Sequence, residues 1–214
     1  MPDVRHFDNR CLNVSGVVVE GSIDERVLAA TRAEVVAFGL RRATMTSIAK
    51  RAGIGRATLY RRATSLDELV RDALVDDYAR MAGELADVAH AAGERTTRAD
   101  IVRLARAILE KLSQDALLRA LLDHDPELLL PYLVDRLGRS QEILVAGFEN
   151  ALREAQLEGS VRAADPRVLA VGALQALTPF VVSRRVLESV APHEMWLDEA
   201  AHLLDAYLAP KEPA

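Results

Sequence analysis

Apolar residues recur along this 214-residue chain at the spacing of helices rather than of strands. A first helix is predicted from Asp24 to Gly39, because its inward positions fall three or four residues apart and glycine commonly ends a helix. Those inward positions are Val27, Thr31, Val35 and Phe38. The same spacing continues through most of the sequence, which predicts an all-α protein.

Two short helices joined by a tight glycine turn are predicted next. Thr44 is placed to cap the first of them, and Gly53 supplies the left-handed residue that ends it. The second begins at Arg56 and turns Leu59 inward. Two helices of this length, crossing where Ala49 leaves room for close approach, are typical of a helix-turn-helix.

Longer helices follow this motif. Ser65 and Glu68 form the pattern of a capping box ahead of an apolar stripe, which predicts the first of them. The chain as a whole is expected to form about nine helices, with an N-terminal three-helix helix-turn-helix domain followed by a helical-bundle domain. Five later helices are predicted. One runs from a cap at Thr97 to residue 112, a second lies near residues 115–123, and a third, long helix ends at Gly159. A fourth begins at Pro166, and the last covers residues 193–208.

Composition narrows the class of protein. Hydrophobic residues make up 50% of the chain but aromatic residues only 4%, which favours helices over sheets. The one cysteine, Cys11, excludes an intramolecular disulfide and any multi-cysteine metal site, and favours a reducing interior. The sequence has neither the pattern of a signal peptide nor an apolar run long enough to cross a membrane, so a cytoplasmic protein without a membrane partner is expected.

Charge is segregated along the chain. Residues 40–64 carry seven basic side chains and no acidic one, while the whole chain has a net charge of −5, which leaves −12 on the remainder. A positive segment in an acidic protein is typical of polyanion binding, because each neutralised phosphate releases counterions. The alternative interpretation is a solvated helix face, although such a face usually carries both signs of charge.

These residues in this order resemble the DNA-binding domain of the TetR/AcrR family of bacterial regulators. The resemblance covers residues 24–80 and rests on the helix that ends at Gly39, on "TMTSIAKRAGI", on "ATLY" and on "SLDEL". It implies double-stranded operator DNA as partner, a homodimer, and an apolar or aromatic small-molecule effector. Two positions depart from the family pattern: Ala63 stands where an aromatic residue is usual, and Leu66 where a lysine usually reaches a phosphate.

The chemistry of the side chains predicts how this domain would contact DNA. Arg56, at the start of the third helix, is placed to reach a guanine edge, and Ala57 and Thr58 are placed to touch a thymine methyl group. Simpler interpretations stay open for Tyr60, which packs in the core of many small domains, and for Thr44, which is also a helix cap. The side chains expected to hold phosphates, as in the family, are Thr44, Thr46, Tyr60, Arg61 and Arg62.

The last two predicted helices are expected to form the dimer interface. In the family they pair with their copies across a two-fold axis, and here they carry small and apolar residues at helical spacing. A single monomeric core would use the same pattern, so that alternative stays open. The expected interface residues are Gly172, Ala173, Ala176, Leu177, Leu197, Ala200, Leu204 and Leu208.

The resemblance also implies that the middle helices enclose a pocket for the effector. Plain core positions are the alternative for each candidate, because apolar and aromatic side chains at helical spacing usually pack in a core. The candidates to line the pocket are Tyr78, Met81, Tyr132, Phe148, Gln175 and Phe180.

Other chemistry is not expected. The stretch Asp123-His124-Asp125 contains residue types that bind metals, but beside Pro126 it is predicted to form a turn and a helix cap. No metal site, no cofactor and no catalytic residues are predicted, because the sequence lacks a nucleophile elbow, a phosphate loop and paired zinc histidines.

The expected domain organisation has three parts. Residues 1–22 form a flexible N-terminal arm or precede the true start, residues 23–68 form the helix-turn-helix domain, and residues 69–210 form the effector-binding and dimerisation domain. The predicted function is a ligand-responsive repressor that binds a near-palindromic operator as a homodimer and is released by a small molecule. The alternative is a helical ligand-binding or enzymatic protein whose helix-turn-helix no longer binds DNA, with Leu66 and Ala63 as the first signs of that loss.

Overall fold

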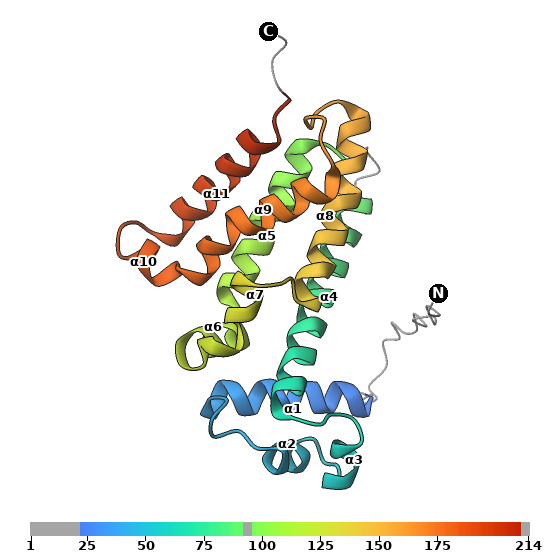
Figure 1. The fold of residues 1–214 in the computed structure, drawn as a ribbon, viewed down its shortest axis with the longest axis vertical. Coiled ribbons are helices and arrows are strands. Elements are labelled where there is room, and N and C mark those ends of the chain that lie inside the picture. The colour runs from blue at the N-terminus through green and yellow to red at the C-terminus, as the bar shows by residue number, and fades with distance from the viewer. Residues whose placement is uncertain (1–21, 92–95, 211–214) are drawn as a thin grey trace.

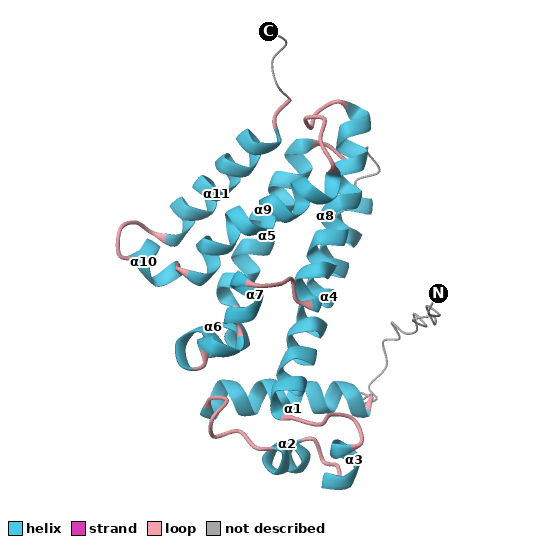
Figure 2. Cartoon of the chain, viewed as in Figure 1, coloured by secondary structure: helices cyan, strands magenta, loops and turns pink. Residues whose placement is uncertain are grey.

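The computed structural model describes residues 22–91 and 96–210, and of residues 84–91 it describes only the backbone. The predicted N-terminal arm and Cys11 lie outside these ranges. All regular structure within them is helical, which confirms the all-α prediction (Figure 2). The helices are α1 (Ile23–Phe38), α2 (Met45–Arg51), α3 (Arg56–Tyr60), α4 (Leu66–Ala91), α5 (Arg98–Gln114), α6 (Ala116–His124), the 3-10 helix η1 (Pro126–Leu128), α7 (Leu130–Val134), α8 (Arg139–Glu158), α9 (Pro166–Val182), α10 (Arg184–Glu188) and α11 (His193–Leu208).

Helices α1, α2 and α3 form a small domain at one end of an elongated molecule, with α1 lying across the beginning of α4 (Figure 1). Ile48 of α2 and Leu59 of α3 are fully buried and pack with Val27 of α1. Ala49 is buried in the same cluster, and Gly53, just after α2, has the positive φ of 67° that its glycine permits. The predicted helix-turn-helix is therefore present.

The predicted helix caps form, with one change of partner. Thr44 caps α2 by accepting a hydrogen bond from the backbone N–H of Ser47 at 3.0 Å. At the start of α4, the hydroxyl of Ser65 accepts from the N–H of Glu68 at 3.2 Å, as the capping-box pattern predicts. The carboxylate of Glu68 accepts instead from the N–H of Thr64 at 2.7 Å, one residue earlier than predicted.

The remaining helices form a larger domain in which α8 packs on α4 and α9, and α5 packs on α11. Its core contains the fully buried leucines of α8, α9 and α11. Arg106 of α5 adds ion pairs to Glu194 at 2.9 Å and Asp198 at 3.0 Å on α11. A search of the described helices for a segment able to span a membrane finds none. The fully buried leucines are Leu152, Leu169, Leu197, Leu204 and Leu208.

Two short helices in this domain, α7 and α10, were not predicted. Each has only five residues, which is too short to display an apolar stripe at helical spacing. The domain boundary predicted after residue 68 falls in the first turn of α4, so a single continuous helix passes from one domain into the other.

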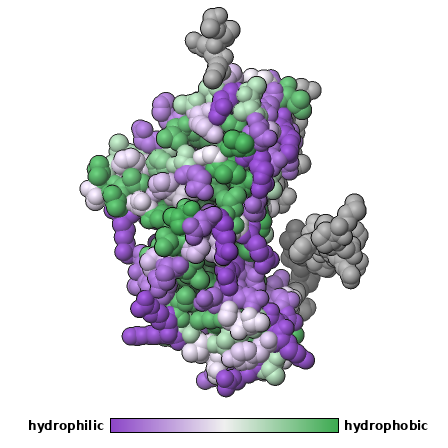
Figure 3. All heavy atoms as spheres, viewed as in Figure 1, coloured by the Kyte–Doolittle hydropathy of each residue, from purple (hydrophilic) through white to green (hydrophobic). Residues whose placement is uncertain are grey.

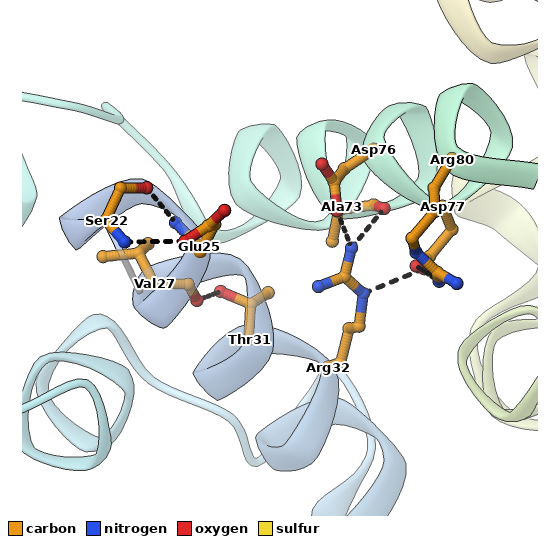
Figure 4. A network of polar contacts seen from close by, with 9 residues as sticks. All are labelled: Ser22, Glu25, Val27, Thr31, Arg32, Ala73, Asp76, Asp77 and Arg80. Atoms are coloured by element: carbon orange, nitrogen blue, oxygen red, sulfur yellow. Dashed lines mark hydrogen bonds and ion pairs between the residues drawn. The ribbon is translucent and has the colours of Figure 1, made fainter. Parts of the chain in front are cut away.

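The small domain is attached to the larger one on two sides. On one side, Arg32 of α1 donates hydrogen bonds to the Asp77 carboxylate at 2.9 Å and to the Ala73 carbonyl at 3.2 Å, both on α4 (Figure 4). On the other side, the backbone N–H of Leu40 donates to the carboxylate of Asp125, which is only 2% exposed, at 3.0 Å. The position of α1 is thus set by both α4 and the end of α6.

Candidate functional site

The basic segment divides into paired and unpaired side chains. Three of its seven basic residues are held by carboxylates: Arg41 by Glu127 at 3.1 Å, Arg51 by Glu34 at 2.7 Å, and Arg62 by Asp24. The other four are exposed, and no carboxylate of a described residue lies within 4.0 Å of them. They are Arg42, Lys50, Arg56 and Arg61. Their positive charge is available to an external anion.

The exposed face of α3 carries the side chains predicted to read bases. Arg56 and Ala57 are exposed at its first turn, and Thr58 is half-buried beside them, while Leu59 points into the core. The hydroxyl of Thr58 accepts a hydrogen bond from the Arg61 guanidinium at 3.4 Å. One helix face therefore presents a guanidinium together with small side chains.

The residues predicted to hold phosphates lie around this face. Tyr60 is 49% exposed, so its ring is not part of the small core. Thr44 and Thr46, at the start of α2, are also exposed, and Thr44 is at the same time the cap of that helix. Arg62 differs from the others because its guanidinium is paired with Asp24 at the start of α1. A phosphate contact by Arg62 would compete with that ion pair.

The two departures from the family pattern have structural roles. Ala63 is 2% exposed and packs in the core of the small domain with Leu59. Leu66, in the first turn of α4, is half-buried and packs against the cores of both domains. Both residues contribute to packing at the junction from which α4 begins.

A cavity of about 360 Å³ lies in the larger domain between α4, α5, α8 and α9. Three of the six predicted pocket residues line it, namely Tyr78, Tyr132 and Phe148. Burial raises the pKa of Tyr78, and the nearby carboxylates of Asp115 and Asp77 add to the rise. Most of the remaining wall is aliphatic and includes Leu74, Ile108, Leu144, Leu174 and Leu177.

The other three predicted pocket residues do not line this cavity. Met81 packs against Ile108 and Leu144 in a separate buried cluster. Gln175 is exposed on α9, and Phe180 packs on the main core while half-exposed. The sequence identified apolar and polar residues at helical spacing but not the side of each helix that faces the cavity.

Sequence reasoning missed the charged residues of the cavity wall. Arg71, Arg136 and Arg139 line it, and none of the described lining residues is Asp or Glu. Arg139 pairs with Asp72 at 2.9 Å. The guanidiniums of Arg71 and Arg136 flank the phenol of Tyr132 and lower its pKa, chiefly through the hydrogen bond from Arg71. Arginines in amphipathic helices ordinarily lie on the surface, so nothing in the sequence placed these three in a cavity wall. Only the neighbouring aromatic residue Tyr132 pointed to this part of the cavity.

The acidic stretch before Pro126 forms the end of α6. Asp125 ends α6 and binds the N–H of Leu40, while Asp123 pairs with Arg185 at 2.7 Å. Across the residues that the structure describes, no group of three or more metal-ligating side chains comes together. The predicted helix end is thus present, with an additional contact to the small domain.

Six of the eight predicted interface residues lie inside the chain rather than on its surface, which corrects their placement. Gly172 lies against the Tyr207 ring, where an added Cβ would come within 2.3 Å of the hydroxyl oxygen, and Ala176 is exposed. An apolar stripe marks a helix face that packs on something, and here it packs on the protomer's own core. The buried residues are Ala173, Leu177, Leu197, Ala200, Leu204 and Leu208.

A helix-turn-helix with unpaired cations, joined by one helix to an all-α domain with an apolar cavity, defines a class of two-domain DNA-binding regulators. Residues 27–73 match the family model described as bacterial regulatory proteins, tetR family. Over 183 residues, the chain is 31% identical to an uncharacterized HTH-type transcriptional regulator of Mycobacterium tuberculosis, covering 86% of this chain and 93% of that protein. The chain therefore belongs to the TetR family of transcriptional regulators, as its sequence motifs predicted.

Solved structures share the whole two-domain fold. SmeT, the repressor of the Stenotrophomonas maltophilia multidrug efflux pump SmeDEF, superposes with a TM-score of 0.64 at 20% identity, covering 89% of this chain and 92% of SmeT. QsdR, a transcriptional repressor of R. erythropolis, gives a TM-score of 0.64 at 18% identity, covering 90% of this chain and 97% of QsdR. The likeness extends through both domains, which confirms the predicted fold class.

Proposed function

We propose that this chain is a ligand-responsive repressor that binds a near-palindromic operator as a homodimer and leaves it when a small molecule enters the cavity. The observation that carries the proposal is the set of four exposed cations that have no carboxylate partner among the described residues, in a chain whose net charge is −5. Negative charge elsewhere disfavours approach to DNA through other faces, so the helix-turn-helix face is the one that meets the phosphates.

Sequence reading is assigned to α3. Arg56 is exposed in its first turn and has no ion-pair partner among the side chains that the structure describes, so its guanidinium is available to make a bidentate contact with a guanine. Lys50 and Arg61 lie nearby along the chain on α2 and just after α3, and their role is to hold phosphates and set the orientation of α3.

A homodimer would contain two helix-turn-helix domains, one for each half of the operator. A five-residue α3 contacts few base pairs, so specificity requires two half-sites related by the two-fold axis of a dimer. The proposed interface uses the outward faces of α9 and α11, beside apolar patches visible over α9 and α10 (Figure 3). Its residues include the exposed Ala176. The exposed apolar side chains on these two helices are Val168, Val182, Met195 and Leu203.

Release is assigned to α4, because this helix belongs to both functional regions. Leu74 and Tyr78 line the cavity, and on the same helix Asp77 holds Arg32 of α1. A ligand that binds better to one position of α4 than to another shifts the population between them, and α1 moves with α4. The two helix-turn-helix domains of the dimer then no longer match the spacing of the half-sites.

The test is selection of DNA duplexes from a random library by the purified full-length protein. The expected enriched sequences are near-palindromic, with half-site centres about 34–36 Å apart or a multiple of that spacing. Enrichment of sequences without two-fold symmetry would contradict binding to the operator as a homodimer. No enrichment at low salt would favour the alternative function, a ligand-binding protein whose helix-turn-helix has lost DNA binding.

A further inference from the structure

The cavity wall has one polar end. Apart from three arginines, its polar side chains are few, and most of the residues along α5 and α9 that face it are aliphatic. Arg71 and Arg136 lie at the end formed by the beginning of α4 and the segment between α7 and α8. Both residues are exposed, so the guanidiniums lie at the rim while the apolar walls enclose the interior.

Among the described residues, neither arginine has a close ion-pair partner, although the carboxylates of Asp67 and Glu68 act on Arg71 from a greater distance. No carboxylate of a described residue lies within 4.0 Å of either guanidinium, in contrast to Arg139, which is paired with Asp72. The Arg136 guanidinium lies 5.5 Å from the centroid of the Tyr132 ring, and Arg71 lines the same cavity and lowers the pKa of that phenol. Two positive groups are therefore held together around one phenol at the rim.

From this arrangement we infer that the effector is an amphiphilic carboxylic acid, with its apolar tail in the cavity and its carboxylate between Arg71 and Arg136. The inference rests on the proposed function and specifies the chemical class of the ligand for that cavity. A carboxylate accepts the forked hydrogen bonds of guanidinium groups, and the tail gains from leaving water. The volume of about 360 Å³ is within the range of small-molecule sites.

The position at the rim favours an acid over other amphiphiles. A carboxylate held there remains partly hydrated, so that its charge is not transferred into the apolar interior, where the cost would be large. A cationic amphiphile would place like charges together, and a neutral alcohol would not form an ion pair with either arginine. In the part of the chain that the structure describes, no Asp or Glu lines the wall to attract a cation.

The same site offers a route to regulation. Arg71 lies on α4 five residues before Asp76, whose carboxylate binds Arg32 of α1 at 2.5 Å. A carboxylate that draws Arg71 toward Arg136 acts on α4 within two turns of its contact with the small domain. The head group, rather than the tail, is thus closest to the helix-turn-helix.

The experiment measures binding of decanoic acid, decan-1-ol and decylamine to the full-length protein by isothermal titration calorimetry at a pH where the acid is ionised. The acid is expected to bind at least about tenfold more tightly than the alcohol, because charge-assisted hydrogen bonds are stronger than neutral ones. Arg71→Gln and Arg136→Gln should each remove most of this preference while leaving alcohol binding unchanged. Arg119→Gln, an exposed arginine of α6 that does not line the cavity, is the control.

Operator release is measured separately by fluorescence anisotropy with each compound. Equal affinity for acid and alcohol, no binding of any of the three, or an acid preference that survives both substitutions would overturn the inferred ligand class. Release by the alcohol but not by the acid would overturn it too, while leaving the proposed regulation intact. Acid binding that depends on the arginines supports the ligand class, and if the operator is then retained, only the proposed release fails.

Discussion

The carboxylate of Asp125 accepts a hydrogen bond from the backbone N–H of Leu40 at 3.0 Å, which joins the end of α6 to the turn after α1. The Arg41 guanidinium approaches the other carboxylate oxygen at 3.4 Å. Since Leu40 lies between α1 and α2, this contact holds the helix-turn-helix to the larger domain independently of α4. In the proposed release through α4, this contact would be a second point of attachment for the turn after α1.

Replacing this buried acceptor should destabilise the junction. Asp125→Ala leaves the Leu40 N–H without a partner, and we expect the free energy of unfolding to fall by about 1–3 kcal/mol in urea denaturation. Asp125→Asn retains an acceptor oxygen and should cost less. Asp123→Ala is the matched control, because Asp123 is exposed and its partner Arg185 lies in the same domain. Equal losses for Asp123→Ala and Asp125→Ala would show that the junction contact adds nothing.

Arg56, at the start of α3, and Arg61, just after it, should differ in what they contribute to DNA binding. Arg56→Ala is expected to weaken operator binding by about 1–3 kcal/mol and to relax the preference at one base position. Arg61→Ala should weaken binding to all sequences alike, because a phosphate contact carries no sequence information. Affinities for a set of single-base operator variants separate the two patterns. A uniform loss with Arg56→Ala would rule out base reading by this side chain.

Substitutions at two neighbouring leucines of α11 test the proposed interface and the protomer core separately. Leu203 is 43% exposed and Leu204 is 1% exposed. Leu203→Asp should give a folded monomer, because it places a charge at the proposed interface of both copies. Leu204→Asp should instead lower the stability of the protomer by several kcal/mol, since it buries an unpaired charge. Light scattering and thermal unfolding together distinguish the effects; a dimeric Leu203→Asp protein would place the interface elsewhere.

The cap at the start of α5 should make the free energy of unfolding depend on pH in the acid range. Hydrogen bonds from the Thr97 hydroxyl and from the Thr97 backbone N–H, at 2.8 Å, lower the pKa of Asp100 below its ordinary value of 3.8. The charged form therefore stabilises the fold above that value, and this contribution is lost as the pH falls through the lowered pKa. Asp100→Asn should reduce stability at neutral pH and make its decline toward acid shallower. Parallel pH profiles of the urea midpoint for parent and variant would contradict this.

The helix-turn-helix was predictable from the sequence because its geometry depends on local residue types. Gly53 is required where φ is positive, Ala49 where two helices approach, and Leu59 where a short helix must bury one side chain. Such constraints are satisfied within a few residues, so they are legible without knowledge of the rest of the chain. The exposed positions of α3 follow from the same local pattern.

The larger domain was less predictable because an apolar stripe on a helix can pack in the core, line the cavity or lie exposed at an interface. Leu204 and Leu203 are the same residue type, and only the packing of α11 on α5 determines which of them is buried. Likewise, Met81 and Tyr78 both lie on α4, yet only Tyr78 faces the cavity. The role of Asp125 could not be predicted at all, since its partner Leu40 is 85 residues away in the sequence.

The salt dependence of operator affinity tests whether the helix-turn-helix face binds DNA as proposed. The measurement is fluorescence anisotropy with a duplex obtained by selection and a scrambled duplex of the same composition, between about 50 and 200 mM salt. With Lys50 and Arg61 of two chains each neutralising a phosphate, log affinity should fall against log salt with a slope of roughly −4 or steeper, and the selected duplex should bind far more tightly throughout. A slope near zero, or equal affinity for the two duplexes, would contradict DNA recognition by this face.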